Sequence, residues 1–481
     1  MDEMLITHGI VFTADSNDNV IDDGAIYIKE GTVHEIGKSA DLLQKFPKAK
    51  QLDASGKVVL PGLVNTHTHL SMTMFRSCVD DVDAVSWLPI IWALEKHNSA
   101  ETVYAGAMLG IAEMIASGTT TFNDQYFFMD EVARAVEETG IRADLAEGIM
   151  ENQSKKRGLE TLERGKQFAA EWNGKANGRI RARMGPHSLY TCSTDLVVKS
   201  RQVADELGVG MHMHIAESPL EMKMVGKKAV GPTSVQHLNA LGILKSDFLA
   251  AHALNIDEKD MQIFAEMEVG VAHCPQSYGK LGAYPFPKID TWVKAGMHVG
   301  LGTDGAASNN DLDLFDEMRF ASLARKLQAK DGTVLSSRQM LRLVTIEGAR
   351  ALGLGEQIGL LEVGKKADII LVDFQQPHFY PLHNIPSHLV YCASGRDVDT
   401  VIVDGKILMQ DREFKTLDIK EVLLHAQQIF QKMLSKAGWK PTISEPKVGI
   451  AATLKLKATQ KSLALIQQLV WKEDSNNQET F

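Results

Sequence analysis

Cysteine is scarce in this chain of 481 residues, which contains four cysteines and no CxxC pair. Widely scattered cysteines argue against a disulfide framework and against a zinc site built from thiolates, and they are typical of a reducing compartment. The N-terminus, MDEMLITHGI, is acidic and lacks the basic and apolar regions of a signal peptide. We therefore expect a cytoplasmic protein.

Long hydrophobic runs and an excess of positive charge are also missing. No stretch offers the ~18 consecutive apolar residues of a membrane span. The 51 Lys and Arg residues are outnumbered by 61 Asp and Glu, which gives a formal net charge of -10. An acidic surface repels nucleic acid and anionic membranes. We therefore expect neither as a partner, and we expect a small-molecule ligand.

The middle of the chain alternates short apolar runs with segments of helical spacing. Two such helical segments, 101–118 and 194–208, close on a glycine. Alternating strands and helices predict a parallel sheet, and eight units match the ~250 residues of a (β/α)₈ barrel. A doubly wound open sheet is the alternative, but no GxGxxG or GxxxxGK loop follows the first strand. The eight predicted strands are 58–67, 119–124, 142–149, 179–187, 209–217, 248–254, 269–275 and 298–304.

The two ends of the chain show a different pattern, in which short runs of β-forming residues predominate. Glu30-Gly31 near the N-terminus and Asp404-Gly405 near the C-terminus are hairpin signals between strand-like runs. We predict that both ends build one small composite β-sandwich domain, from 1–59 and 361–440, beside a barrel at 60–360. Beyond it, 441–481 is predicted to hold a short helix (SLALIQQLVW, 462–471) and a polar tail.

Polar side chains of the kinds used in catalysis stand where predicted strands end. Barrel enzymes build their active sites at the carboxyl ends of the strands. The residues in question are His67, His69, Asp124, Glu147, His187, His214, Glu217, His252, His273 and Asp304.

A metal site is the simplest interpretation of part of this set. Residues i and i+2 of a strand point to one side, so His67 and His69 can aim at a common point. His214 adds an imidazole and Asp304 a carboxylate, and this donor set suits a divalent metal such as zinc. A bound metal lowers the pKa of water to about 7, which provides hydroxide at neutral pH.

Several nearby histidines have a structural interpretation. His212 precedes the predicted ligand His214 by two residues and is expected to pack or to support it. His298 begins the last strand, at the face of a barrel that serves stability. For His273 the sequence leaves two possibilities open, a buried histidine bonded to a carbonyl or a member of the site.

The ordered motifs PGLVNTHTHL, SGTTTFND, GPHSLYTCS, HMHIAES, AAHAL and GLGTDGAASNNDLDLFDEMR resemble those of the amidohydrolase superfamily. Within it, they are similar to the 5′-methylthioadenosine/S-adenosylhomocysteine deaminases and the related chlorohydrolases. The similarity extends to about residue 435. It implies the (β/α)₈ barrel with a composite β domain, a homo-oligomer, and one divalent metal, Zn²⁺ first, with Fe²⁺ or Mn²⁺ as alternatives.

The resemblance also implies roles for individual residues. Glu217 matches the family's proton-transferring glutamate, and His252 matches the histidine that holds the attacking water. Together with Asp304 they form the implied catalytic set. The implied metal ligands are His67, His69, His214 and Asp304, and the implied substrate contacts are Trp87, Glu95, His187, Glu217 and Ser308.

The chain departs from its relatives in three places. Glu147 stands where relatives often carry an arginine that holds an amino-acid carboxylate, with Arg157 nearby in sequence. Tyr278 and Gly279 replace the usual pair in SNxKL, and IWALE replaces IWPxE. The first two changes lie in substrate-facing loops, so the substrate stays open.

Three functions compete on this basis. The first is a metal-dependent hydrolytic deaminase of an adenine nucleoside such as 5′-methylthioadenosine, S-adenosylhomocysteine or adenosine. The second is an aminohydrolase or chlorohydrolase of another purine, pterin or triazine-like heterocycle. Glu217 favours deamination, because the loss of ammonia needs a proton donor. The third, a binding protein without catalysis, predicts a missing ligand or acid, and none is missing.

Overall fold

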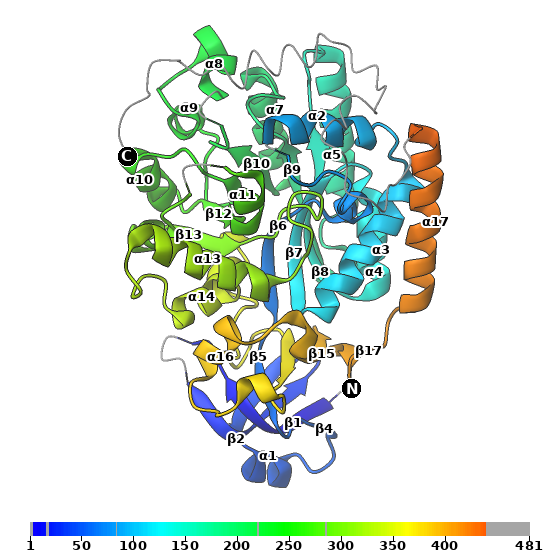
Figure 1. Cartoon of the computed structure of the whole chain (residues 1–481), viewed down its shortest axis with the longest axis vertical. Coiled ribbons are helices and arrows are strands. Elements are labelled where there is room, and N and C mark those ends of the chain that lie inside the picture. Colours follow the sequence, from blue (N-terminus) through cyan, green and yellow to red (C-terminus); the bar gives the residue numbers. More distant parts are fainter. Residues whose placement is uncertain (1–2, 16–18, 83, 219–220, 284–285, 439–481) are drawn as a thin grey trace.

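Eight parallel strands form the central sheet of the computed structural model, which describes residues 3–438 except 16–18, 83, 219–220 and 284–285 (Figure 1). Their spatial order follows the sequence, as in the predicted barrel. Each of the eight predicted segments holds one of them. They are β6 (Leu63–Thr68), β7 (Thr119–Tyr126), β8 (Arg142–Ile149), β9 (Ile180–Pro186), β10 (Gly210–Ile215), β11 (Phe248–His252), β12 (Gly270–His273) and β13 (His298–Leu301).

Polar contacts join β13 to β6 and bring the sheet to near closure. The Asp304 N–H donates to the His67 carbonyl over 3.0 Å. The Asn65 side-chain amide donates to Thr303 Oγ1 over 2.8 Å, and its oxygen accepts the Thr303 N–H over 3.1 Å. A side chain at Gly300 would place its Cβ 2.3 Å from the Thr66 methyl carbon, so this close approach requires glycine.

Helices surround the barrel and connect its strands (Figure 1). The two helical segments predicted from spacing are confirmed as α3 and α7. Ser99 and Ser193 cap their N-termini by accepting backbone N–H groups, and Gly208 ends α7 with a φ of 65°. The helices of this part of the chain are η1 (Leu70–Phe75), α2 (Ala84–Glu95), α3 (Ala100–Ala116), α4 (Met129–Thr139), α5 (Lys155–Trp172), α6 (Lys175–Gly178), α7 (Thr194–Leu207), α8 (Glu221–Val225), η2 (Gly226–Lys228), α9 (Ser234–Ala240), α10 (Glu258–Glu266), α11 (Pro275–Leu281), α12 (Ile289–Lys294), α13 (Leu314–Ala329), α14 (Ser337–Leu343) and α15 (Ile346–Ala351).

The two chain ends meet in a second sheet of nine strands, which confirms the composite β domain. Strand β5 from the N-terminal part pairs antiparallel with β14 from the C-terminal part, and apolar side chains of both parts share one core. The elements are β1 (Glu3–Phe12), β2 (Val20–Lys29), β3 (Thr32–Lys38), α1 (Ser39–Lys45), β4 (Lys50–Asp53), β5 (Lys57–Pro61), β14 (Ile369–Asp373), η3 (Pro377–Phe379), α16 (Ile385–Tyr391), η4 (Gly395–Asp397), β15 (Val398–Val403), β16 (Lys406–Gln410) and β17 (Glu413–Phe414).

Both hairpin predictions in this domain are confirmed. Glu30-Gly31 joins β2 to β3, and Asp404-Gly405 joins β15 to β16. All four residues have positive φ, as a two-residue turn of type I′ requires.

The prediction of a single strand at 58–67 is wrong. The run is divided between β5, in the nine-stranded sheet of the composite β domain, and β6, in the barrel. Gly62 separates them: its N–H donates to the Asp368 carbonyl, and a Cβ there would lie 2.1 Å from Thr120 Oγ1. The chain therefore changes sheets at a point where only glycine fits.

A buried ion pair connects the barrel to the composite β domain. Arg142 at the start of β8 donates from Nε and Nη2 to the two Asp368 oxygens, over 2.8 and 3.0 Å. Both side chains are at most 4% exposed. The Asp404 N–H donates to the same carboxylate over 2.7 Å.

The last described helix, α17 (Ile419–Ala437), lies within the range 361–440 but packs along the barrel helix α3 (Figure 1). Ala426 and Ile429 share an apolar cluster with Met74 and Ala105. The helix predicted at 462–471 and the polar tail lie outside the described residues. Within the described part of the chain, no helix is long and apolar enough to cross a bilayer.

Candidate active site

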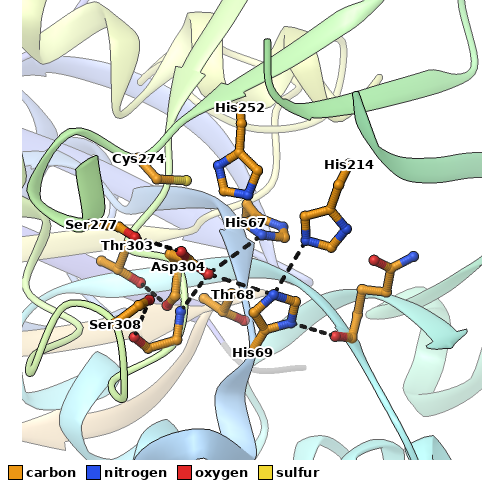
Figure 2. Close-up of polar contacts among 12 residues, drawn as sticks. His67, Thr68, His69, His214, His252, Cys274, Ser277, Thr303, Asp304 and Ser308 are labelled. Carbon is orange, nitrogen blue, oxygen red and sulfur yellow. Dashed lines mark hydrogen bonds and ion pairs between the residues drawn. The ribbon is translucent and has the colours of Figure 1, made fainter. Parts of the chain in front are cut away.

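Four histidines and one aspartate converge at the carboxyl ends of the barrel strands, and Figure 2 shows their side chains pointing toward one another. His67 belongs to β6, His214 to β10 and His252 to the end of β11, while His69 and Asp304 lie just after β6 and β13. Asp304 Oδ1 lies 3.7 Å from His67 Nε2 and 3.5 Å from His69 Nε2. His214 Nε2 lies 3.3 Å from His69 Nε2.

The second nitrogen of each predicted ligand histidine is engaged outside this point. Nδ1 of His69 contacts the Gln125 carbonyl at 2.7 Å, and Nδ1 of His214 contacts the His187 carbonyl at 2.9 Å. A carbonyl only accepts, so both Nδ1 atoms carry the proton and both Nε2 atoms keep a lone pair. Nδ1 of His67 contacts Nε2 of His212 at 3.1 Å, which gives His212 the supporting position predicted for it.

The inward-facing nitrogens are suited to a cation. Burial, followed by neighbouring imidazoles, holds the pKa of His67 and His214 well below the usual range, so both rings are neutral. His67 Nε2 is fully buried and has no hydrogen-bond partner among the described residues. An unpartnered buried nitrogen is costly. Two overlapping groups, His67–His69–Asp304 and His67–His214–His252, have donor atoms close enough together to hold one ion.

Asp304 is held in an unusual backbone conformation with a φ of 58°. Ser277 donates to its Oδ2 over 2.7 Å, and the Gly305 N–H donates to its Oδ1 over 2.8 Å. Burial alone would raise the pKa of this carboxyl, but the His69 and His252 imidazoles and these hydrogen bonds outweigh it and lower the pKa. Asp304 is therefore ionised at neutral pH.

Glu217 lies beside the cluster, with its Oε1 4.0 Å from His252 Nε2. Tyr190 donates its hydroxyl to Oε2 of Glu217 over 3.0 Å. The loop that carries Glu217 is held by buried Glu221, which accepts the N–H groups of Ala216 and Glu217. Burial raises the pKa of Glu221 to about 7.

The predicted substrate contacts surround this centre. The His187 ring lies 4.6 Å from the His214 ring, and burial lowers the pKa of His187 to about 3. Glu95, at the end of α2, accepts the Tyr126 hydroxyl over 2.7 Å, and the Tyr126 ring lies 6.3 Å from the His69 ring. Burial raises the pKa of Glu95 to about 7, although the Tyr126 hydrogen bond opposes this.

Trp87 and Ser308 contact the loop after Asp304. The Trp87 indole donates to the Ala307 carbonyl over 3.2 Å, so α2 is anchored beside the site. The Ser308 hydroxyl donates to the Gly305 carbonyl over 3.0 Å and is 1% exposed. In the structure, Ser308 therefore supports the Asp304 loop.

Other strand-end carboxylates are bound into the scaffold. Asp124 accepts the Leu70 N–H over 2.8 Å and the Thr68 hydroxyl over 3.1 Å. Glu147 accepts the Met129 N–H and pairs with Arg164, both over 2.8 Å. Arg157 lies exposed at the start of α5.

The two remaining histidines lie apart from the cluster. His298 begins β13, at the amino end of the strand. His273 is fully buried between the rings of Tyr278, Phe286 and Trp292. Neither of its ring nitrogens has a hydrogen-bond partner among the described residues, so the predicted bond to a carbonyl is not seen.

Sequence reasoning missed two residues that hold the site together, Tyr190 and Ser277, and named a third, Tyr278, only as a change in a substrate-facing loop. Tyr190 supports Glu217, Ser277 supports Asp304, and Tyr278 contacts His252. The only sequence signal for Tyr190 and Ser277 is that each follows a barrel strand within a few residues of a predicted site histidine.

Comparisons with known proteins agree on one family. Residues 58–408 match the model of the amidohydrolase family. A 5′-deoxyadenosine deaminase of Methanosarcina mazei is 42% identical over 91% of this chain and 99% of its own length. A 5-methylthioadenosine/S-adenosylhomocysteine deaminase of Pelotomaculum thermopropionicum is 42% identical over 91% of this chain and all of its own.

Solved structures show the same fold. An adenosine deaminase from Xanthomonas campestris with bound zinc superposes with a TM-score of 0.84 and 31% identity, over 90% of this chain and 98% of its own. A zinc-complexed atrazine chlorohydrolase from Arthrobacter aurescens superposes with a TM-score of 0.81, over 89% of this chain and all of its own. At 24% identity, this second likeness concerns the fold alone.

Proposed function

The chain belongs to the amidohydrolase family, and from that premise we propose that it is a metal-dependent hydrolytic deaminase of adenine nucleosides. One observation carries the proposal: the imidazoles of His67, His69 and His214 and the Asp304 carboxylate face one point at the mouth of the barrel, with the Glu217 carboxyl 4.0 Å from His252. The relatives named as deaminases of adenine nucleosides align along almost their entire length.

We propose that His67, His69, His214 and Asp304 hold one divalent metal, with zinc first because the Xanthomonas relative binds it. The buried, unpartnered nitrogen of His67 fits such an ion. When bound, a metal of this kind lowers the pKa of a water molecule to about 7.

The remaining groups are placed to move protons. Asp304 is ionised and can accept a proton from the attacking water, and His252 can hold that water in line. Glu217 can protonate the ring nitrogen next to the amino-bearing carbon and can then help ammonia to leave. Its hydrogen bond from Tyr190 keeps the carboxyl turned toward His252.

For substrate binding we propose that Glu95 receives the ribose hydroxyls. It is held by Tyr126, whose strand neighbour is Glu147. Glu147 is engaged with Arg164, so this guanidinium is not free to bind a substrate carboxylate. The site therefore favours nucleosides with a small neutral 5′ group, such as 5′-deoxyadenosine or 5′-methylthioadenosine, over S-adenosylhomocysteine.

We also propose a cytoplasmic homo-oligomer. All four cysteines are free thiols in the structure, which fits a reducing compartment. Light scattering of the purified protein measures the assembly, and a monomer at all concentrations would contradict this part.

The function is tested by ammonia release from purified, zinc-loaded protein. The panel comprises adenosine, 5′-deoxyadenosine, 5′-methylthioadenosine and S-adenosylhomocysteine, with a pterin and a chlorotriazine as other heterocycles. We expect the highest kcat/KM with a small neutral 5′ group. Turnover of the pterin or triazine alone would replace the proposed substrate class, and no turnover with bound metal would refute the deaminase.

A further inference from the structure

We propose that Tyr278 is a positioning residue that fixes the tautomer of His252, with the proton on Nε2, the nitrogen that faces the site. The inference deepens the proposed function and rests on it for the role of His252. Tyr278 is one of the two residues that replace the usual pair of the SNxKL motif in this chain.

The hydrogen bonds of the Tyr278 hydroxyl define the tautomer. Its oxygen accepts the Cys274 N–H over 2.9 Å and lies 3.2 Å from His252 Nδ1. Among the described residues, two acceptors lie near the phenolic proton, His252 Nδ1 and the Cys274 sulfur, and thiol sulfur accepts hydrogen bonds only weakly. If Nδ1 carried a proton, this phenolic proton, on a side chain only 3% exposed, would be left with the weak thiol acceptor. The hydroxyl therefore donates to Nδ1, and the histidine proton resides on Nε2.

This arrangement is the opposite of that at His69 and His214. Their Nδ1 atoms face backbone carbonyls, which only accept, so their Nε2 atoms offer lone pairs to a metal. The ring nitrogens of His252, His67 and His214 lie close enough together to hold one ion, but this closeness does not take account of the His252 tautomer. Its Nε2–H can donate a hydrogen bond to an oxygen, but it cannot bind a metal.

The same turn of α11 holds both proton-handling groups. Ser277 donates to Asp304, and its neighbour Tyr278 contacts His252. Gly279 lets this turn approach α13, because a Cβ there would lie 2.5 Å from the Phe320 ring. The Tyr-Gly pair therefore fits as a unit and places the hydroxyl against His252.

The histidines therefore have different roles: His252 donates a hydrogen bond, whereas His69 and His214 offer lone pairs to the metal. His252 presents an N–H toward the point where water attacks, with the Glu217 carboxyl 4.0 Å away. Without the Tyr278 hydroxyl, His252 is free to place its proton on Nδ1 and turn a bare Nε2 inward. That form cannot donate to the water oxygen.

The test is the Tyr278→Phe variant in the zinc-loaded protein. We expect kcat to fall by about 10- to 10³-fold with KM changed less than threefold, because loss of the partner that orients a catalytic histidine costs up to about 10⁴-fold. Tyr391→Phe is the matched control: its hydroxyl bonds Ser322 Oγ over 2.9 Å, and neither residue is one of the proposed site residues. We expect that variant to keep wild-type kinetics and one metal per chain.

Nitrogen NMR of histidine-labelled protein reads the tautomer without turnover. We expect His252, assigned by its loss in His252→Gln, to carry its proton on Nε2 in the wild type and to lose this preference in Tyr278→Phe. Because Phe also leaves the Cys274 N–H unpaired, difluorotyrosine at 278 serves as a second variant. Measured below the pKa of the fluorinated phenol, so that the hydroxyl keeps its proton, this variant retains both contacts and must keep the Nε2–H form.

An unchanged His252 signal in Tyr278→Phe overturns the inference, as does a proton on Nδ1 in the wild type. A kcat within twofold of wild type, with the phenylalanine variant folded, also overturns it. If no adenine nucleoside is turned over, the proposed function fails, while the NMR result still decides the tautomer.

Discussion

The Glu217→Gln variant separates proton donation from every other property of this side chain. The glutamine oxygen can still accept the Tyr190 hydroxyl, which lies 3.0 Å from Glu217 Oε2 in the wild type. The size of the side chain and its place beside His252 are retained. The proton that we propose Glu217 gives to the ring nitrogen, and later to ammonia, is lost.

The expected magnitude follows from that single loss. A positioned acid contributes about 10²- to 10⁴-fold, which at 1.36 kcal/mol per decade is roughly 3 to 5 kcal/mol of activation free energy. We expect kcat for 5′-deoxyadenosine to fall within this range. KM should change little, because the groups proposed to bind the ribose, Glu95 with Tyr126, are untouched.

The assay compares an amino leaving group with a chloro leaving group on the same ring. Chloride leaves without a proton, so the 6-chloropurine analogue needs Glu217 for the ring nitrogen alone. We expect the variant to lose at least tenfold less activity on the chloro substrate than on the amino substrate. Equal losses on both, with full metal content, would refute the role of Glu217 in ammonia departure.

Three further predictions concern pH, metal and stability. Burial raises the pKa of Glu95 from 4.5 to about 7, so its contribution to stability is present below about pH 4.5 and is lost as pH rises through about 7. Glu95→Gln should therefore raise the Tm at pH 8 but not at pH 4, and should raise KM for nucleosides; an equal change in Tm at both pH values contradicts the assignment. Chelation should lower the Tm. Zinc at about 100 times its Kd should then restore roughly 2.7 kcal/mol of the free energy of unfolding, because it binds only the folded protein; a Tm that does not change with zinc argues against a resident metal. Arg142→Met leaves buried Asp368 unpaired and should cost about 3–5 kcal/mol in urea unfolding, most of which Arg142→Met with Asp368→Leu recovers; no recovery would show that the pair itself is needed.

The barrel strands could be predicted because they are buried on both faces and read as short apolar runs. Their polar ends mark the face that carries the site, which is why ligand-type residues appeared in order along the sequence. The division of 58–67 between two sheets could not be predicted. Strand β5 in the composite β domain and β6 in the barrel are both almost wholly buried and adjoin in sequence, and the contacts of Gly62 with Thr120 and Asp368 mark the change of sheet between them.

The candidate ligands were accessible to sequence reasoning because their geometry is local. His67 and His69 are two residues apart, and strand periodicity alone turns them to one side. The contacts of Glu147 could not be predicted in this way. Its partner Arg164 lies on the next helix, and the carboxylate predicted to face the substrate is instead bound at the start of α4.

The residues that orient the site lie one strand–helix unit away from those they hold. Tyr190 and Glu217 are 27 residues apart, as are Ser277 and Asp304, and Tyr278 is 26 residues from His252. Parallel neighbours in a barrel are separated by one such unit, so each strand end is supported by the loop of an adjacent strand. What that loop offers, a carbonyl or a hydroxyl, decides which nitrogen of a histidine keeps its lone pair. The same ligand set can therefore support different chemistry when only the loops change, and substitutions such as Tyr278 are where members of one family should diverge.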